Sequence, residues 1–328
     1  MSAITSEVKQ VNANVLRHFV KISSKEKLAH AYLFIGPDSI GKSQTAVEIV
    51  KLINCENNAD GSKEEACRAC PSCLKIASGN HPDIFMINKG DTSSIKIGAI
   101  REMLQRMQLR PFEARLKAVI IKNIEDLTVE GSNALLKTLE EPTRGSLLIL
   151  TTAVPEVCLS TVRSRCHPVY FFAMPRRELL ETLEKKLLID KEEAHFLSLY
   201  TEGCLGKAVQ LHEEGFFQQK NVIIDNIIFN RNNEGYIKSL VMDKVQVKVV
   251  LEVLLSWFRD ALLMKLGTKS EYLAHSDRPQ DLHQVEVKYD FDDIRGIIQE
   301  IVNTKRLLNE NLNIKIPLQL LREKIWVG

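Results

Sequence analysis

The first half of the chain alternates short apolar runs with stretches whose apolar residues recur at helical spacing. Five runs are compact and apolar, as strands buried on both faces of a sheet should be. They are AYLFIG (31–36), DIFMI (83–87), AVII (118–121), LLILTT (147–152) and PVYFF (168–172). Helices are expected between them at about 43–53, 97–108, 130–141 and 156–163. This alternation predicts an α/β fold in which helices cover a parallel sheet.

The strand pattern ends after Pro175, and helical patterns fill the rest of the chain. Three short amphipathic helices are expected at 176–187, 191–200 and 206–214. A long leucine-rich helix is expected at 245–267, and the polar stretch that follows it, 268–288, is interpreted as a loop. Two further helices are expected at 290–310 and 316–326. The second half therefore predicts helical domains.

Composition narrows the class of protein only slightly. The chain has 328 residues, enough for about two or three domains. Its net charge of +2 gives no strong overall field that favours nucleic acid or acidic lipid. Any contact with DNA must therefore be local or shared with partners.

Targeting signals are not evident, and the cysteines suggest a reducing compartment. The N-terminal stretch MSAITSEVKQVNANVLRHF lacks the features of a secretory signal. No apolar run approaches the roughly 20 residues that a membrane helix needs. Seven cysteines in such a chain point to the cytoplasm, where clustered cysteines are metal ligands more often than disulfides.

A complete phosphate-loop pattern follows the first predicted strand. The segment GPDSIGKS (36–43) matches G-x-x-x-x-G-K-S and opens a predicted helix, which is the context that the motif requires. Gly36 and Gly41 let backbone N–H groups turn inward around phosphate oxygens, while Lys42 would reach the outer phosphates and Ser43 would bind Mg²⁺. The pattern indicates a fold built around a nucleoside triphosphate, with ATP the candidate ligand. The alternative is a relic that binds nucleotide weakly or not at all.

The strand that should supply the catalytic acid does not end in one. Hydrolysis needs an acid at the end of a neighbouring strand to hold Mg²⁺, and usually a second acid to polarise the attacking water. The candidate strand at 118–121 is followed by Lys122 and Asn123, and a lysine cannot bind a cation. Glu125 and Asp126 follow a few residues later and either substitute for that acid or are solvated loop charges. The sequence thus predicts little or no hydrolysis by this chain.

Four cysteines, Cys55, Cys67, Cys70 and Cys73, form the pattern C-x11-C-x2-C-x2-C. Three cysteines at such tight spacing, with a fourth nearby, satisfy tetrahedral zinc. Because all four ligands are thiolates, no position stays open for water, and the site is predicted to be structural. The alternative is four unrelated thiols.

The triplet SRC (164–166) lies between a short predicted helix and an apolar strand. Arg165 would project there from the edge of the sheet. It is then able to reach a nucleotide on a neighbouring subunit and to stabilise charge on the transferring phosphate. The alternative is an ordinary surface arginine.

Together these residues resemble the bacterial clamp-loader subunits of the AAA+ class, and most closely the delta-prime subunits of DNA polymerase III. The resemblance covers the first 210 residues well and continues more loosely to the end, where LLSWFRDALL (254–263) is similar to the family's helical collar. The matching stretches are HAYLFIGPDSIGKS (30–43), the four cysteines, HPD (81–83), SNALLKTLEEP (132–142), SRC (164–166) and GCLGKA (203–208).

The resemblance implies a role for each departure from the motor subunits, gamma and tau. Those subunits carry an acidic pair where this chain has Lys122 and Asn123, and a lid arginine where it has Gly206, next to Lys207. Both departures favour the stationary delta-prime subunit, which closes one end of a five-subunit arc. For Arg165 the resemblance implies an arginine finger acting in trans on an adjacent motor subunit. The intact loop departs from delta-prime subunits that have lost it and leaves ATP binding open.

We therefore expect three domains and one main function. The domains are a P-loop AAA+ α/β domain at 1–173 with a zinc module at about 55–73, a helical lid at 174–236, and a helical collar at 237–328. The function implied is a cytoplasmic clamp-loader subunit that joins gamma/tau and delta in a hetero-pentamer and helps to place the sliding clamp on primed DNA. The polymerase label of the holoenzyme, a nucleotidyltransferase complex, would describe the assembly and not this chain.

Two alternatives stay open at the level of sequence. One is an active ATPase motor subunit of the same loader, and ATP turnover by the isolated chain that depends on Lys42 would favour it. The other is a zinc-dependent DNA-binding module on an inert P-loop fold. Strong, steeply salt-dependent binding of DNA by the lone protein would favour this second alternative.

Overall fold

The structure, a computed structural model, describes residues 12–23, 27–58, 63–90, 92, 94–230, 235–236, 243–310 and 314–325. Contacts divide the chain into two compact units. The first runs to Met174 and includes Cys204–Lys207, and the second comprises Pro175–Gly203 and the residues from Ala208 onward. The finer division of the second unit into a lid and a collar stays a prediction.

The first unit is built on a five-stranded parallel sheet with the order β2-β3-β4-β1-β5. The sheet and all five strands predicted from the sequence are confirmed, with ends that differ by one or two residues. The strands are β1 (Ala31–Ile35), β2 (Ile84–Ile87), β3 (Lys117–Ile121), β4 (Ser146–Thr152) and β5 (His167–Tyr170).

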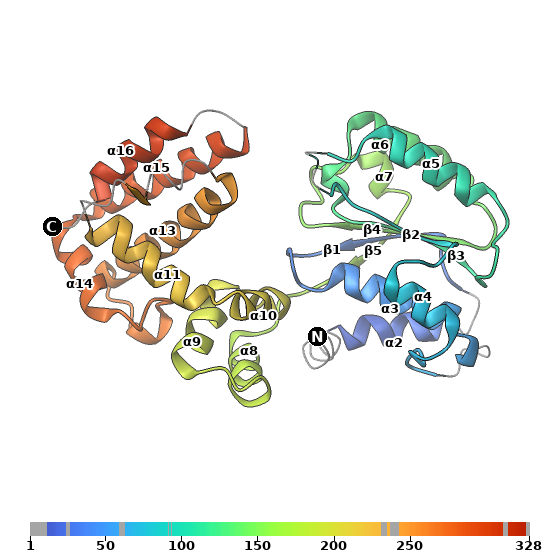
Figure 1. The fold of residues 1–328 in the computed structure, drawn as a ribbon, viewed down its shortest axis with the longest axis horizontal. Coiled ribbons are helices and arrows are strands. Elements are labelled where there is room, and N and C mark those ends of the chain that lie inside the picture. Colours follow the sequence, from blue (N-terminus) through green and yellow to red (C-terminus); the bar gives the residue numbers. More distant parts are fainter. Residues whose placement is uncertain are drawn as a thin grey trace. The chain divides into compact units, whose positions relative to one another are not determined.

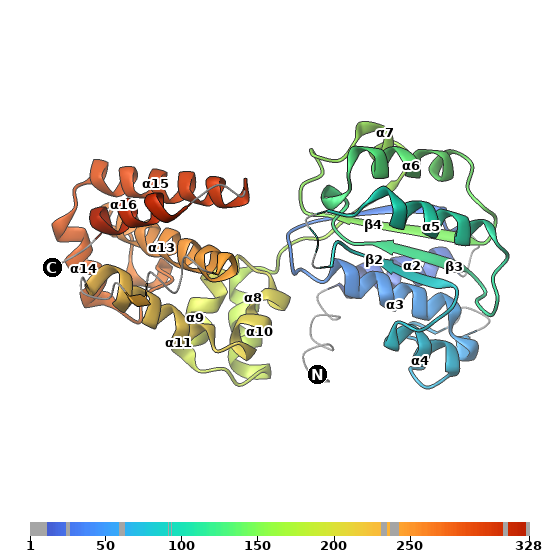
Figure 2. The same ribbon diagram turned by 45° about the horizontal axis from the view of Figure 1, so that its top comes forward.

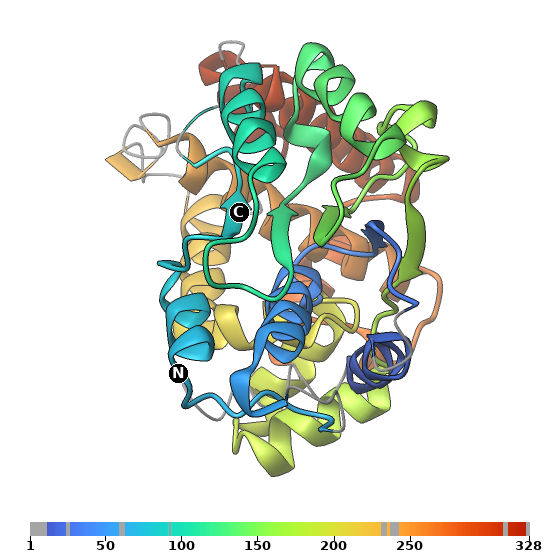
Figure 3. The ribbon, with the colours of Figure 1, turned by 90° about the vertical axis from the view of Figure 1, so that its right-hand side faces the viewer.

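Helices cover both faces of this sheet (Figures 1 and 2). One layer contains α2 (Ala13–Ser23), α3 (Lys42–Asn54) and α4 (Pro71–Ser78). The other contains α5 (Ile97–Gln108), α6 (Val129–Glu140) and α7 (Ser160–Arg163). Figure 3 shows the two layers from the side, with the blue α3 below the sheet and the teal and green helices above it.

Two short helices and one boundary differ from the expectation. The helices α2 and α4 were not predicted. The helix expected at 156–163 begins only at Ser160, because the preceding residues form a turn in which Val157 N–H bonds to Val154 O at 3.1 Å. Pro155 in this turn favours such a start over a continuous helix.

Alternate strand residues supply the two cores of the first unit. Leu33, Val119 and Leu150 pack with α5 and α6 on one face. Phe34 and Ile120 pack with α2 and α3 on the other. Because successive side chains of a strand point to opposite faces, a sheet covered on both sides needs continuous apolar runs, and that is the pattern in the sequence.

In the residues that the structure describes, the second unit consists of helices and their connecting turns, with no strand. Its long helix α13 (Lys244–Lys265) buries Leu251, Trp257 and Phe258. The other elements are α8 (Arg176–Glu181), η3 (Thr182–Lys186), α9 (Lys191–Tyr200), α10 (Leu205–Glu213), α11 (Phe216–Ile224), η4 (Asp225–Phe229), η5 (Ser270–Tyr272), α14 (Pro279–Lys288), α15 (Phe291–Asn309) and α16 (Lys315–Ile325). None of the helices within the described ranges has the length and apolar character needed to cross a bilayer.

The loop expected at 268–288 is wrong, because half of it is helix α14. Pro279 occupies the first turn of that helix, where its fixed φ is compatible with helix and its missing N–H costs nothing. Only Leu282 and Val285 of α14 are buried, three residues apart on one face. Two apolar positions in a polar stretch give too weak a period to reveal a helix from the sequence.

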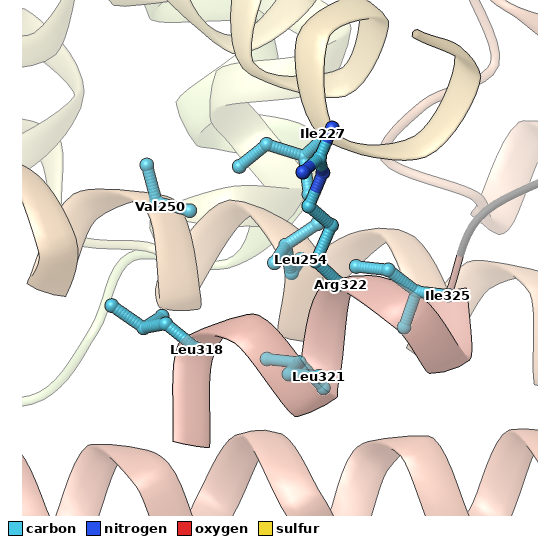
Figure 4. A pocket seen from close by; sticks show the side chains of 7 residues that line it. All are labelled: Ile227, Val250, Leu254, Leu318, Leu321, Arg322 and Ile325. Atoms are coloured by element: carbon cyan, nitrogen blue, oxygen red, sulfur yellow. The ribbon is translucent and has the colours of Figure 1, made fainter. Parts of the chain in front are cut away.

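Helix α16 packs against α15 and η4, and a small apolar cavity is lined by residues of α16, η4 and α13 (Figure 4). The cavity measures about 20 Å³. That volume is large enough for about one water molecule, but an apolar lining gives a water few hydrogen-bond partners. The lining residues are Ile227, Val250, Leu254, Leu318, Leu321, Arg322 and Ile325.

A buried polar cluster connects α13 with the segment before α14. The ring of His275 is fully buried, its Nε2 lies 3.2 Å from Ser256 Oγ, and its backbone N–H donates to Asp260 Oδ2 at 2.8 Å. Asp277, two residues after His275, forms a buried ion pair with Lys220 at 2.6 Å. Four buried atoms of this cluster have no hydrogen-bond partner among the described residues: Trp257 Nε1, Asp260 Oδ1, His275 Nδ1 and Asp277 Oδ1.

Two titratable groups of this cluster, His275 and Asp260, change the stability of the fold with pH in opposite directions. Burial, followed by the charges of Lys220, Arg259 and Arg278, lowers the pKa of His275 well below its ordinary value. Burial also raises the pKa of Asp260 to about 6. Folding therefore loses stability through His275 as the pH falls below about 6.5, where the unfolded histidine takes a proton. Through Asp260 it gains stability as the pH falls below about 6, because the folded state holds the proton more tightly.

Replacing His275 should isolate the first of these effects. Between pH 7.5 and 5.5, the wild-type chain should lose more free energy of unfolding than His275→Gln, by up to about 1.4 kcal/mol per pH unit, the slope for one proton bound only when unfolded. Urea unfolding at both pH values measures the difference. His283, whose side chain is 66% exposed, provides the matched control His283→Gln. Equal pH dependence of the wild-type chain and His275→Gln would contradict the assignment.

Candidate functional site

The predicted phosphate loop lies at the carboxyl edge of the parallel sheet. It begins at Gly36, directly after β1, and leads into α3 at Lys42. The strands β3 and β4 end at the same edge, because all five strands are parallel. In open α/β sheets this edge is where ligands bind.

Glycine is required at both glycine positions of the loop. A Cβ at Gly36 would lie 2.6 Å from the carbonyl oxygen of Phe171, so any side chain there would collide with the segment after β5. Gly41 adopts φ 98°, a left-handed conformation that other residues avoid. The predicted role of these glycines, to let the backbone approach a ligand closely, is therefore consistent with the local geometry.

Lys42 folds back over its own loop. Its Nζ donates to Gly36 O at 2.6 Å and to Pro37 O at 2.7 Å, and Asp38 lies 4.0 Å away. An ammonium group has three donors, so these two bonds leave one for an anion above the loop. Burial lowers the pKa of Lys42, although Asp38 and Glu125 oppose that shift. The loop together with the amino end of the thirteen-residue α3 thus fits a bound phosphate.

The end of β3 lies beside β4 and holds no acidic pair. Lys122 and Asn123 follow the strand, and Asn123 adopts φ 53°. The Asn123 N–H donates to Thr151 Oγ1 at 3.0 Å. In a motor subunit, these two positions would bind Mg²⁺ and activate the attacking water. Here they carry a cation and an amide.

The two acids that follow behave differently from each other. Asp126 forms an ion pair with Lys89 at 3.1 Å. Glu125 Oε1 accepts from the Ala153 N–H at 3.0 Å, whereas its Oε2 is buried without a partner among the described residues. Of the two candidates for a substitute acid, only Glu125 acts electrostatically on Lys42.

Gly206 packs directly on the tip of the phosphate loop. The residues Cys204–Lys207 group with the first unit, and a Cβ at Gly206 would collide with the carbonyl oxygen of Ser39. Ser39 itself adopts φ 58°. The lid arginine that the motor subunits carry at this position does not fit here while the loop keeps this conformation.

The four predicted metal ligands lie together. The sulfur atoms of Cys55, Cys67, Cys70 and Cys73 all lie within 4.8 Å of one another. Thiolates bound to one zinc ion at about 2.3 Å would lie about 3.8 Å apart, so the cluster is of the right size. Cys55 ends α3, and Cys70 caps α4 by accepting from the Cys73 N–H. The four cysteines are therefore placed to bind a metal.

Backbone N–H groups surround these sulfurs. The N–H of Cys67 points to Cys55 Sγ at 3.4 Å, and that of Cys70 points to Cys67 Sγ at 3.3 Å. Bonds from the backbone at Ala69 and Cys70 lower the pKa of Cys67 to about 6, whereas burial raises the pKa of Cys73. Donors aimed at sulfur stabilise thiolates, which are the form that binds a metal.

Arg165 lies partly exposed just before β5. Its Nη1 donates to Thr161 O at 3.0 Å, and its Nη2 forms an ion pair with Glu140 at 2.6 Å. Cys166, the next residue, is buried in the core, and burial raises the pKa of its thiol to about 12. The triplet therefore combines a partly exposed Arg165 with a neighbouring Cys166 that is fixed in the core.

Two polar residues gain roles that the sequence did not reveal. Asp83, of the HPD stretch, accepts N–H bonds from Phe112, Glu113 and Ala114 at 2.8–2.9 Å, and Lys117 lies 3.6 Å away. Burial favours a raised pKa for Asp83, but these bonds outweigh it and the pKa is lowered. The role of Asp83 is therefore to hold the loop before β3.

Glu140 is the second such residue. It lies within SNALLKTLEEP, a stretch that the sequence singles out only as a marker of resemblance. The sequence contains no signal that links Glu140 to Arg165. The two residues are 25 positions apart, and no periodicity connects them.

Family models match both halves of the chain. The model described as "DNA polymerase III, delta subunit" matches residues 11–175, about half of the chain. The model "DNA polymerase III, delta subunit, C terminal" matches residues 214–323.

Curated relatives point the same way. The chain is 25% identical over 327 residues to DNA polymerase III subunit delta' of Bacillus subtilis, covering 96% of each chain. It is 27% identical over 259 residues to subunit delta' of Pseudomonas aeruginosa, covering 78% of this chain and 76% of the relative. It is 31% identical over 169 residues to subunit tau of Bacillus subtilis, which is 52% of this chain but only 29% of that protein.

The contact between Gly206 and the phosphate loop can be tested by adding one methyl group. Gly206→Ala should lower the free energy of unfolding by about 1–3 kcal/mol, the usual cost of overpacking a close contact. Gly98→Ala is the matched control, because a Cβ there meets no atom within 4 Å. It should be neutral or stabilising by up to about 1 kcal/mol, since alanine is the better helix former. Chemical denaturation of the two variants measures both effects, and equal stability would refute the contact.

Proposed function

This chain belongs to the DNA polymerase III delta-subunit family, and we propose that it is the delta-prime-like subunit of a clamp loader. In this proposal it assembles with gamma/tau and delta subunits in a cytoplasmic hetero-pentamer. The assembly opens the sliding clamp and places it on primed DNA. This chain supplies a fixed end of the assembly and hydrolyses little or no ATP.

The observation that carries the proposal is the phosphate loop without its acids. The loop at residues 36–43 keeps its glycines and lysine, whereas Lys122 and Asn123 stand where a motor needs acids. A lysine near the metal position repels Mg²⁺, so a nucleotide held here would bind without being hydrolysed. Nucleotide in this loop would then stabilise the subunit and not drive the loader.

A motor role for this chain is less well supported. Asp126 is engaged with Lys89, and Gly206 offers no side chain to a nucleotide. Glu125 alone stays near the loop, and its Oε1 is already bonded to the end of β4. One carboxylate in this position does not replace the acidic pair of a motor.

Arg165 would act on a nucleotide bound by a neighbouring motor subunit. Arginine suits this role because its planar guanidinium stays charged and offers five donors to phosphate oxygens. Its side chain is partly exposed on the first unit, and the next residue in the chain, Cys166, is buried. Charge on the transferring phosphate is stabilised from outside the motor subunit, which couples hydrolysis to assembly.

Zinc is the metal that best fits the cysteine cluster. Four thiolates with tetrahedral spacing bind zinc and leave no open position for water. The ion would tie the end of α3 to α4 and thereby stabilise a module with few apolar residues of its own. Its role would be structural.

Replacing Arg165 should impair the loader and spare this chain. Arg165→Ala should lower the DNA-stimulated ATPase of the reconstituted loader about twofold or more, because the affected site loses a contribution of about 10³- to 10⁵-fold. Its melting temperature should match that of the wild type, since an exposed ion pair contributes little to stability. The neighbouring exposed Arg163 provides the control Arg163→Ala. Wild-type ATPase with Arg165→Ala would refute the finger.

Zinc should be present at about one ion per chain when the protein is purified without chelators. Cys70→Ser should remove it and lower stability, because Cys70 also caps α4. Elemental analysis of both proteins measures the content. Cys158→Ser, at a buried cysteine outside the cluster, should retain the metal. A native protein free of metal would rule out the assignment.

A further inference from the structure

We propose that Glu140 is the positioning residue for Arg165, holding the guanidinium where a neighbouring subunit's nucleotide can meet it. The inference rests on the proposed trans-acting role of Arg165. It assigns a function to a carboxylate at the end of α6 that no sequence pattern singles out. Its basis is the ion pair between Glu140 Oε1 and Arg165 Nη2 at 2.6 Å.

The Arg165 guanidinium is contacted at both of its terminal nitrogens, but not all of its N–H donors are used. Nη1 donates to Thr161 O at 3.0 Å and to Ser164 Oγ at 3.4 Å, while Nη2 contacts Glu140. Three contacts take at most three of the five N–H donors of an arginine. At least two donors stay available for phosphate oxygens, and 36% of the side chain is exposed. The carboxylate thus fixes the direction of the group without using it up.

Glu140 is itself well fixed. It is the last residue of α6, and the residue before it, Leu139, is buried in the core. The carbonyl of Leu139 lies 3.1 Å from His30 Nε2, which ties the end of α6 to the start of β1. Cys166 and Val162 are buried in the same core as Leu139, so both ends of the ion pair rest on one packed layer. A pair supported in this way keeps its geometry better than one between two free surface side chains.

The conformational entropy of a surface arginine explains why a positioning carboxylate such as Glu140 helps. A free arginine on a surface samples many rotamers, and that freedom is lost when it binds a phosphate. An ion pair that already restricts the guanidinium reduces this loss. The negative end of the α6 dipole favours the cation at the same place. Stability of the fold gains little, because the side chains of Glu140 and Arg165 are 52% and 36% exposed.

The test uses the loader reconstituted from this chain with its gamma/tau and delta partners, the clamp and primed DNA. Glu140→Ala should lower the kcat of the DNA-stimulated ATPase about 2- to 5-fold, as expected for one exposed ion pair. The KM for ATP should stay unchanged, since the nucleotide is bound by another subunit. Glu140→Asp should retain more activity than Glu140→Ala, and Glu140→Gln serves if the alanine variant is unstable. The adjacent exposed carboxylate gives the matched control, Glu141→Ala, which should behave as the wild type.

A double variant separates positioning of the finger from any other role. In the Arg165→Ala background, Glu140→Ala should cause no further loss, because the group that it positions is gone. An equal loss in both backgrounds, or wild-type activity of Glu140→Ala and Glu140→Gln, would overturn the inference while leaving the finger intact. If Arg165→Ala itself leaves the ATPase unchanged, the proposed finger fails first and this inference fails with it.

Discussion

The burial of both faces of the parallel sheet is the constraint on which the rest of the first unit depends. Strands covered on both sides must be apolar throughout, and their parallel order brings the ends of β1, β3 and β4 to one edge. The phosphate loop, the replaced acids and the glycine that packs on the loop all meet there. The residues at this edge, and not the apolar strands, therefore carry the candidate function.

In the proposed function, this edge binds a nucleotide without hydrolysing it. The loop retains a phosphate cradle, with Lys42 bonded to two carbonyls of its own backbone and one donor in reserve. The positions that would hold and use Mg²⁺ carry Lys122 and Asn123, and Gly206 removes the lid side chain. In the proposed role, this chain contributes to catalysis through Arg165, which acts on a neighbouring subunit's nucleotide and not on the chain's own site. In the proposed positioning role, the ion pair with Glu140 gives the Arg165 guanidinium a defined direction.

Polar residues elsewhere serve to hold segments that the apolar core does not reach. Asp83 binds three successive N–H groups before β3, and four cysteines collect around the end of α3. In the second unit, His275 and Asp260 are buried with opposite titration behaviour. The Asp83 carboxylate in this way satisfies backbone N–H groups that burial would otherwise leave without partners.

Sequence alone determined the features that depend on neighbours along the chain. The five apolar runs gave the strands, the spacing of GPDSIGKS gave the loop, and the resemblance to delta-prime subunits is confirmed by the family match. Tertiary structure alone decided that Glu140 meets Arg165, that Gly206 touches Ser39, that Asp83 holds residues 112–114 and that 279–288 is a helix. The physical reason is that periodicity records which face of an element is buried. It carries no record of which distant polar group, or which backbone, the folded chain brings against that element.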